Sequence, residues 1–287
     1  MVWDITGKRV LITGGNSGIG RATAVDLARR GALVTITARN PERGRQAVEA
    51  IRHTDGVDVA LGSLDLGSLD DVRRFAQGFT KGLDHLDVLI NNAGVMTGRR
   101  RETADGFEWT FAVNHLGPFL LTNLLLGHLA AAPTARVITV SSDAYRFARY
   151  GMDFDDLQMT RRYSSMRAYA ASKLANILFA LELDRRMRGA GLISRVLHPG
   201  LVATGFGRDP ESALYMRIGM RLVRPLLKTP ERGAETSIFL STAPDEVLAE
   251  SLFWSEGVAA RPTKAATDAA SASRLWEVSE RLVGLNR

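Results

Sequence analysis

The strand-forming segments of this chain are apolar without alternation. Val10-Leu11-Ile12 and Val88-Leu89-Ile90 are two examples, and longer runs with helical periodicity separate such segments. Strands have this composition when both faces of their sheet are covered, which is typical of parallel sheets. Strands that alternate with helices build an open, doubly wound sheet through right-handed crossovers. The sequence therefore predicts one α/β domain over residues 1–287, with a mostly parallel seven-stranded sheet between two helical layers.

The expected elements follow from apolar runs and from helix-end chemistry. Strands are expected at residues 9–13, 33–38, 57–61, 88–91, 136–140, 193–197 and 251–254. Helices are expected at residues 19–30, 41–52, 69–79, 106–130, 165–188, 230–241 and 267–283. In such folds ligands bind beyond the carboxyl ends of the strands, so the residues that follow each strand carry most of the information about function.

Composition removes several kinds of active site. The chain holds no cysteine, which excludes disulfides, thiolate metal ligands and a cysteine nucleophile. Its five histidines form no pair at metal-ligand spacing, so we expect no metal site. His115 and His198 lie near the expected site, and we interpret both as structural histidines.

The net charge of +6 at pH 7 raises the question of a nucleic acid or an anionic membrane as partner. No basic stripe interleaved with aromatic residues accompanies this charge, so we expect no nucleic-acid partner. No apolar run is long enough to span a bilayer, and the first residues lead into a strand rather than a signal peptide. We therefore expect a cytoplasmic protein, at most peripheral to a membrane.

A glycine-rich turn follows the first strand and opens the first helix. It reads Thr13-Gly14-Gly15-Asn16-Ser17-Gly18-Ile19-Gly20. The turn gives backbone room for a pyrophosphate, and the free N–H groups of a helix N-terminus favour an anion there. A glycine pattern alone is a weak signal, but this one has the strand–turn–helix context that dinucleotide binding requires. The cofactor contacts expected here are Gly14, Asn16, Ser17, Gly18, Ile19 and Gly20.

The second strand ends in Thr37-Ala38-Arg39-Asn40, about 20 residues past the glycines. A carboxylate at this point would bind the adenosine ribose 2′-hydroxyl of NAD(H), whereas arginine suits the 2′-phosphate of NADP(H). The chain offers Arg39, with Arg43 one turn later, and no acid. NADP(H) is therefore favoured over NAD(H); the alternative is that both arginines are solvated surface residues.

Two further strands end in residues that suit a cofactor. Asp65, followed by Leu66, could accept a hydrogen bond from an adenine amino group or could cap the next helix. The fourth strand ends in Asn91-Asn92-Ala93-Gly94, whose small side chains permit close approach of the backbone to a cofactor.

Tyr169 and Lys173 stand four residues apart in an expected helix, so they share one helix face. A phenol with a pKa of about 10 is a poor base at neutral pH. A nearby ammonium, or the charge of an oxidised nicotinamide, favours the phenolate and lowers the phenol pKa. The pair therefore suggests acid–base chemistry.

Together these residues make the chain similar to the short-chain dehydrogenase/reductase family. The match runs in order through the glycine turn, residues 91–94, Asn114, Ser142, the Tyr169/Lys173 pair and Pro199-Gly200. Residues 113–119, 156–158, 172–176 and 274–280 resemble the retinol dehydrogenase-like group within it. Membrane-bound members of that group carry an N-terminal anchor, whereas this chain begins at its first strand, so a retinoid substrate is not implied.

The resemblance implies a single NAD(P)-binding Rossmann domain and a role for each matched residue. Tyr169 would be the general acid/base, and Lys173 would lower its pKa and hold the nicotinamide ribose. Ser142, preferred over its neighbour Ser141, would bind the carbonyl oxygen, and Asn114 would hold a water of a proton relay. The further cofactor contacts that it implies are Asn92, Ala93, Gly94, Pro199, Gly200, Val202 and Thr204.

Residues 205–228 would cover the substrate in this fold. Their basic residues 217, 221, 224 and 228 recur at helical steps beside an apolar series. We interpret the segment as a lid over a lipophilic substrate; the alternative, compatible with the first, is weak contact with an anionic membrane surface.

The sequence thus predicts an NADP(H)-dependent oxidoreductase that interconverts an alcohol and its ketone or aldehyde. The substrate is expected to be small and lipophilic. The alternative is a non-catalytic NADP(H)-sensing protein on the same fold, which would have no need of Ser142, Tyr169 and Lys173 together. Many members of the family are dimers or tetramers, and the likeness to the retinol dehydrogenase-like group makes a homo-oligomer less expected.

Overall fold

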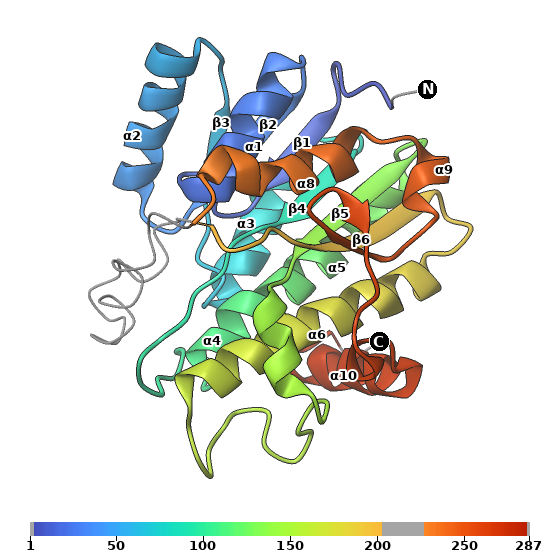
Figure 1. The fold of residues 1–287 in the computed structure, drawn as a ribbon. Helices are drawn as coiled ribbons and strands as arrows, with labels where there is room; N and C mark the ends of the chain where they lie inside the picture. The colour runs from blue at the N-terminus through green and yellow to red at the C-terminus, as the bar shows by residue number, and fades with distance from the viewer. Residues whose placement is uncertain (1–2, 203–226, 286–287) are drawn as a thin grey trace.

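The computed structural model describes residues 3–202 and 227–285, and in these residues eight strands form one sheet in the order β3-β2-β1-β4-β5-β6-β7-β8 (Figure 1). Strands β1 to β7 run parallel, and β8 pairs antiparallel with β7. Their bounds are β1 Arg9–Ile12, β2 Leu33–Ala38, β3 Ala60–Ser63, β4 Val88–Asn91, β5 Ala135–Val140, β6 Leu192–His198, β7 Phe253–Ser255 and β8 Val258–Ala259. The mostly parallel sheet is confirmed, with a two-residue edge strand added to the seven predicted.

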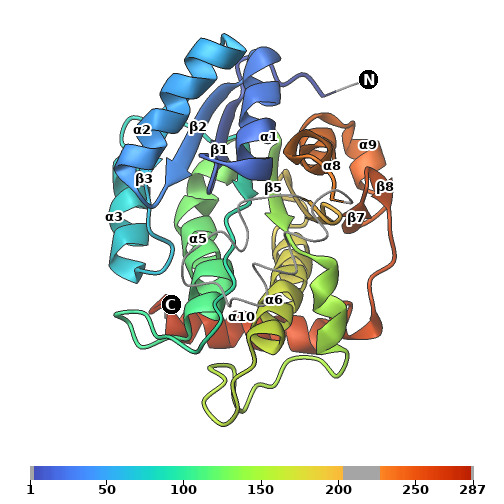
Figure 2. The same ribbon diagram turned by 60° about the vertical axis from the view of Figure 1, so that its left-hand side comes forward.

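Two helical layers cover the sheet, as Figures 1 and 2 show. The first contains α1 (Gly18–Arg29), α2 (Pro41–Ala50), α8 (Pro230–Thr242) and α9 (Asp245–Leu248). The second contains α3 (Leu69–Thr80), α5 (Gly117–Ala130), α6 (Ser165–Arg186) and α10 (Ala269–Leu282). Within β1, Leu11 belongs to the core under the second layer, and Val10 and Ile12 belong to the core under the first. Burial on both faces explains why the strands lack alternation.

The expected helix at 106–130 is interrupted. A short α4 (Trp109–Phe111) leads into a π-helical segment at Ala112–Leu116, and α5 begins only at Gly117. Glu108 sets the start, because its buried carboxylate accepts hydrogen bonds from the N–H groups of Thr110 (2.9 Å) and Phe111 (2.7 Å). Pro118 has no N–H to donate to the Asn114 carbonyl, so a regular α-helix loses a bond at this point. The wider π-helical segment lies just before this proline. Such π-bulges inside helices are often found at functional sites.

Two strand positions were also predicted wrongly. The third strand occupies Ala60–Ser63 rather than residues 57–61, because its register with β2 pairs Ala38 with Ser63. The seventh occupies Phe253–Ser255 rather than residues 251–254, because it pairs with the end of β6 up to His198. Apolar content identified both strands, but pairing with the neighbouring strand decides where each begins and ends.

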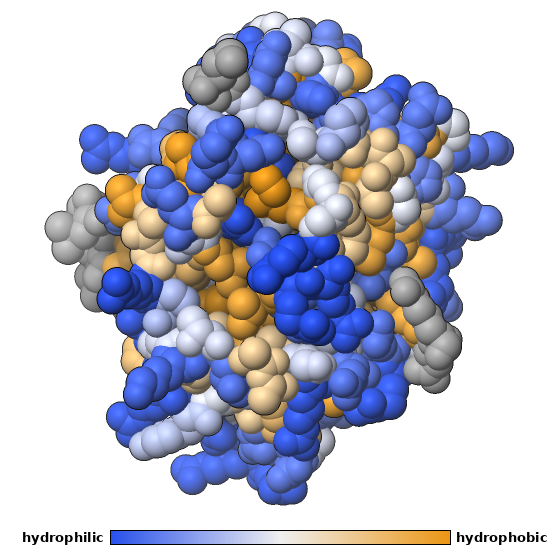
Figure 3. Space-filling view, turned by 90° about the vertical axis from the view of Figure 1, so that its right-hand side faces the viewer, coloured by the Kyte–Doolittle hydropathy of each residue, from blue (hydrophilic) through white to orange (hydrophobic). Residues whose placement is uncertain are grey.

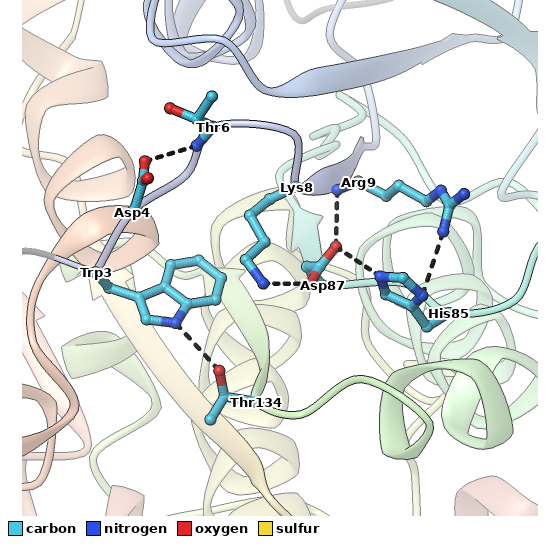
Figure 4. A network of polar contacts seen from close by, with 8 residues as sticks. All are labelled: Trp3, Asp4, Thr6, Lys8, Arg9, His85, Asp87 and Thr134. Carbon is cyan, nitrogen blue, oxygen red and sulfur yellow. Dashed lines mark hydrogen bonds and ion pairs between the residues drawn. The ribbon is translucent and has the colours of Figure 1, made fainter.

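A buried carboxylate joins β1 to β4 at the amino ends of the strands (Figure 4). Asp87 is fully buried and lies 3.1 Å from the Lys8 ammonium, and it accepts a hydrogen bond from the Arg9 N–H at 2.8 Å. The His85 ring lies 3.5 Å from the carboxylate oxygen that accepts the Arg9 N–H. These contacts hold the neighbouring strands β1 and β4 together at the edge opposite to the one where the motifs lie.

The surface is mixed in character. Figure 3 shows the molecule from the right-hand side of Figure 1, with hydrophobic residues gathered in the middle of this face among hydrophilic ones. Among the helices that the structure describes, none combines the length and the apolar character needed to cross a bilayer.

Candidate active site

The carboxyl ends of β2, β1, β4, β5 and β6 lie side by side in the sheet. The motif residues predicted from the sequence follow these ends, so one edge of the sheet brings together segments from the first, middle and last thirds of the chain. The expected cofactor contact Thr204 and most of the expected lid at residues 205–228 lie outside the residues that the structure describes. Of the lid, only Leu227 and Lys228 are described.

The glycine turn packs tightly on its surroundings. Gly14 and Gly18 have φ of +65° and +53°, a region that favours glycine. A Cβ at Gly20 would lie 2.5 Å from the Asn92 side-chain nitrogen, which donates a hydrogen bond to the Thr13 carbonyl at 2.8 Å. The turn and the residues after β4 are therefore fastened together with no space for a side chain between them.

The N-terminus of α1 lies at this turn. Its N-cap, Ser17, makes no side-chain capping bond among the described residues. Ile19 packs with Val202, which follows β6, and with Ala234 of α8. An uncapped first turn beside a glycine cradle is the arrangement that accepts a pyrophosphate, so these residues fit the dinucleotide that the motif implies.

Arg39 follows β2 and is exposed, with its guanidinium carbon 5.7 Å from the centroid of the Trp109 ring. Arg101 lies on the same ring at 4.8 Å. Trp109 was not identified from the sequence, since the aromatic residue is 70 positions from Arg39 and no local pattern connects them. The Arg43 side chain is exposed, while its backbone N–H bonds the Asn40 side chain that caps α2.

Asp65 forms a turn rather than a helix cap. Its Oδ1 accepts a hydrogen bond from the Gly67 N–H at 2.9 Å, and α3 is instead capped by Ser68, whose Oγ accepts from the Asp71 N–H at 3.3 Å. The alternative that Asp65 caps the next helix is therefore wrong. Leu66 is buried in the core.

Lys173 crosses from α6 to the ends of β4 and β5. Its ammonium donates a hydrogen bond to the Val140 carbonyl at 3.0 Å. A Cβ at Gly94 would lie 3.2 Å from Nζ, so glycine is what lets the β4 loop pass this close to the ammonium. Lys173 is 2% exposed. Burial lowers its pKa to about 8, because the surroundings disfavour the charged form.

Tyr169 lies one turn earlier in α6, with the Lys173 ammonium 5.6 Å from its ring centroid. Burial raises the pKa of Tyr169 to about 12, and a hydrogen bond with the Ser142 side chain lowers it by less. Desolvation is the largest cause, so the net shift of the phenol pKa is upward in the protein alone. That Lys173 lowers this pKa stays a prediction.

The structure gives the two adjacent serines different partners. The Ser141 hydroxyl donates to the Lys173 carbonyl at 2.8 Å and is buried, so it ties β5 to α6. The Ser142 hydroxyl bonds Tyr169 and also accepts from the Ala144 N–H at 3.3 Å. The second serine is therefore the one beside the phenol.

Asn114 lies in the π-helical segment and is fully buried. Its Oδ1 accepts from the Val95 N–H at 2.7 Å, and its Nδ2 donates to the Val95 carbonyl at 2.9 Å and to the Ser172 hydroxyl at 2.9 Å. The amide thus joins the loop after β4 to the helix that carries Tyr169 and Lys173.

The loop after β6 closes the arrangement. Gly200 has φ of +82°, and a Cβ there would lie 3.2 Å from the Lys228 Nζ. Val202 forms an isolated parallel bridge with Lys228, which pairs with Glu256 at 2.5 Å. Pro199 and Gly200 are partly exposed beside these contacts.

The two histidines interpreted as structural are both hydrogen-bonded. His115 bonds the Ser279 hydroxyl at 2.8 Å inside an aromatic cluster, and burial lowers its pKa to about 3. The His198 Nδ1 accepts from the Asp143 N–H at 3.1 Å. Among the described residues, no group of three potential metal ligands gathers.

A family model described as short chain dehydrogenase matches residues 8–154. The chain is 42% identical to Retinol dehydrogenase 14 of Mus musculus, over 97% of this chain and 86% of that protein. It is also 42% identical to Retinol dehydrogenase 13 of Homo sapiens, over 98% of this chain and 86% of that protein. The chain belongs to the short-chain dehydrogenase family.

Solved structures agree with this membership. A protein described as uncharacterized, from Mycobacterium paratuberculosis, superposes with a TM-score of 0.76 at 35% identity, covering 99% of this chain and 96% of that one. A metagenomic short-chain oxidoreductase solved in complex with NADP has a TM-score of 0.63 at 24% identity over 91% of this chain and 99% of that one, and this likeness concerns the fold alone. Membership and the retinol dehydrogenase relatives support an oxidoreductase that uses a nicotinamide cofactor on alcohol and carbonyl groups.

Proposed function

We propose that the protein is an NADP(H)-dependent oxidoreductase that interconverts a small lipophilic alcohol and its ketone or aldehyde. The observation that carries the proposal is the position of Ser142, Tyr169 and Lys173 at one edge of the sheet, within one packed unit with the glycine turn. The retinol dehydrogenase relatives support an alcohol of low polarity as the substrate class.

Tyr169 is the proposed proton donor in reduction and acceptor in oxidation. A bound NADP(H) supplies or takes the hydride, and the protein supplies the proton and orients the carbonyl. The pKa of about 12 keeps Tyr169 protonated in the protein alone, which suits donation of a proton to a developing alkoxide. Its hydrogen bond to Ser142 holds the hydroxyl in one direction, where both groups can reach the same substrate oxygen.

Lys173 is proposed to hold the nicotinamide ribose. An ammonium has three N–H donors, and one of them is engaged by the Val140 carbonyl. The glycine at position 94 leaves room beside Nζ for this contact. Since the pKa of Lys173 is about 8, most of the ammonium is charged at neutral pH. This positive charge would favour the phenolate form of Tyr169 when the phenol gives up its proton.

Asn114 is proposed to support the proton relay through its backbone. Its side-chain amide is engaged with Val95 and Ser172, so the relay water that we expected would bind the Asn114 carbonyl instead. Pro118 removes the α-helical partner of that carbonyl, which supports this placement.

Preference for NADP(H) is proposed from Arg39. Its guanidinium stands on the Trp109 ring at the end of β2, where the family's cofactor ribose would lie, and no acid occupies that strand end. Arg43, one helical turn later, would add a second positive charge. The remaining proposed contacts are those at Gly14, Asn16, Ser17, Gly18, Ile19, Gly20, Asp65, Leu66, Asn92, Ala93, Gly94, Pro199, Gly200, Val202 and Thr204.

The experiment that tests the proposal is a screen of NADPH and NADH oxidation against a panel of lipophilic aldehydes and ketones. We expect turnover with NADPH on at least one class of compound and weaker turnover with NADH. Tight NADPH binding without turnover on any carbonyl or alcohol would support the sensor alternative, and preference for NADH would overturn the role of Arg39.

A further inference from the structure

The contacts between β5 and β6 continue beyond the end of β5, first through a backbone hydrogen bond and then through the His198 side chain. The Ser141 N–H donates to the Leu197 carbonyl at 2.7 Å, and this bond extends the ladder by one residue. Ser142 is still extended, with φ of −158° and ψ of 149°, and a short 3-10 helix begins at Asp143. The next amide, that of Asp143, donates to the His198 Nδ1 at 3.1 Å. A histidine ring thus takes the place of a backbone acceptor at the point where β5 leaves the sheet.

This bond fixes the peptide that directly follows the proposed substrate-binding serine. Ser142 is held on its amino side by the ladder bond of Ser141 and on its carboxyl side by His198. Its hydroxyl then bonds Tyr169. His198 is 9% exposed, so its ring is packed and its direction is defined by its neighbours.

We propose that His198 is a positioning residue for catalysis: its neutral imidazole accepts the Asp143 amide and so keeps the Ser142 hydroxyl directed at Tyr169 and the substrate oxygen. The inference rests on the proposed function, because it assigns to His198 the orientation of a group that acts only if the site reduces a carbonyl. It goes beyond the structural role expected of this histidine, since it predicts an effect on turnover that depends on one ring nitrogen.

Protonation would remove the acceptor. Neutral histidine offers one ring nitrogen as an acceptor, whereas both nitrogens of the charged ring carry hydrogen. A protonated Nδ1 would face the Asp143 N–H with a second N–H, and the bond would be lost.

The charges around the ring come from three segments. Burial is the largest cause and lowers the His198 pKa below its usual value of 6.5. Asp143 in the loop after β5 and Glu256 in the β7–β8 turn raise the pKa, while Lys228 before α8 and Arg146 lower it. The ring is therefore neutral at pH 7, and its acceptor is lost only as the pH falls through the lowered pKa.

The test compares two substitutions of His198 in the full chain. His198→Asn places a side-chain oxygen near the Nδ1 position and cannot titrate, and His198→Leu keeps bulk but offers no acceptor. We expect kcat for carbonyl reduction to fall by about tenfold in His198→Leu, the size of one hydrogen bond to a positioned group, and to stay near wild type in His198→Asn. The KM for NADPH should change in neither. His53→Leu, at an exposed histidine of the first helical layer, is the matched control and should leave kcat unchanged.

The pH profile gives a readout that a merely structural histidine would not move. In the reductive direction Tyr169 must be protonated, so it adds no loss of activity at low pH. Wild-type kcat should therefore decline on the acid side as His198 protonates, and His198→Asn should remain active there. Equal acid limbs in the two proteins, or equal loss of kcat in the Asn and Leu variants at pH 7, would overturn the inference.

An activity-independent measurement separates this inference from the proposed function. Hydrogen exchange of the Asp143 amide, followed by NMR, should be slow in wild type and His198→Asn and faster in His198→Leu. If no carbonyl compound is turned over by wild type, the proposed function fails whatever the exchange shows. If wild type turns over and His198→Leu matches its kcat, the inference alone fails.

Discussion

Lys173 is a buried ammonium, and its burial has a consequence for stability. Its pKa falls from 10.5 to about 8 in the folded protein, while the unfolded chain keeps the ordinary value. Between these two values the unfolded chain binds more protons than the folded protein, so folding stability rises with pH there. The penalty for burying the charge is fully present at pH 7 and shrinks as the pH rises past 8.

Replacement of Lys173 by methionine should remove this pH dependence. We expect the wild-type free energy of unfolding, relative to that of Lys173→Met, to rise by about 1 kcal/mol between pH 7 and 9. Denaturant titrations of both proteins at the two pH values measure the difference. A constant difference would show that the folded protein does not perturb the titration of this lysine.

Arg39 should determine cofactor preference. Removal of a charge-assisted contact with a phosphate costs about 1.5–3 kcal/mol, or roughly 10- to 100-fold in kcat/KM. We expect Arg39→Ala to lower kcat/KM for NADPH by about that factor and to leave kcat/KM for NADH nearly unchanged.

The control for that substitution is Arg45→Ala, at an exposed arginine of α2 paired with Glu42 at 2.7 Å. It should leave both kcat/KM values unchanged, because solvent screens such pairs. Equal loss with both cofactors in Arg39→Ala would point to a general structural effect and against a 2′-phosphate contact.

At the scale of elements, the buried carboxylate of Asp87 connects β1 to β4. Its partners are the Lys8 ammonium and the Arg9 N–H, so its removal would leave two partly buried donors without their acceptor. Asp87→Ala should lower the free energy of unfolding by about 3 kcal/mol. Chemical denaturation measures this loss.

The matched comparison is Asp58→Ala. Asp58 pairs with Arg52, and both side chains are more than half exposed, at 78% and 63%. That substitution should change the free energy of unfolding by less than about 0.5 kcal/mol. Similar losses in the two variants would contradict the view that burial decides the value of these contacts.

The expected and observed elements differ where a side chain or a neighbouring strand intervenes. Apolar periodicity predicted one helix through residues 106–130, but Glu108 starts the helix later and Pro118 replaces one turn by a π-helical segment. Apolar periodicity indicates which face of a helix is buried. It does not show where a proline removes a backbone hydrogen bond from the helix. The same limit applies to β3, whose position follows from its register with β2.

At the scale of the whole molecule, the doubly wound sheet could be predicted because strands buried on both faces have continuous apolar sequences. The order of motif residues along the chain also placed the site, since the carboxyl ends of parallel strands meet at one edge. Contacts between distant side chains could not be predicted in this way. Trp109 beneath Arg39 and His198 beside Asp143 join residues 70 and 55 positions apart, and only the folded chain brings them together.

Some of the basic residues behind the net charge of +6 have specific partners or proposed roles. Lys173 stands beside the proposed acid, Arg39 and Arg43 lie at the proposed phosphate site, and Lys8 pairs with Asp87. That no nucleic acid binds the protein stays a prediction from the sequence.

The central claim is that Tyr169 transfers the substrate proton, and Tyr169→Phe tests it most directly because only the hydroxyl is removed. The measurement is kcat for NADPH-dependent carbonyl reduction together with the Kd for NADPH in the same preparation. General acid catalysis contributes about 10²- to 10⁴-fold, so kcat should fall by at least a hundredfold while the Kd is retained. Turnover at the wild-type rate with normal NADPH binding would contradict the account.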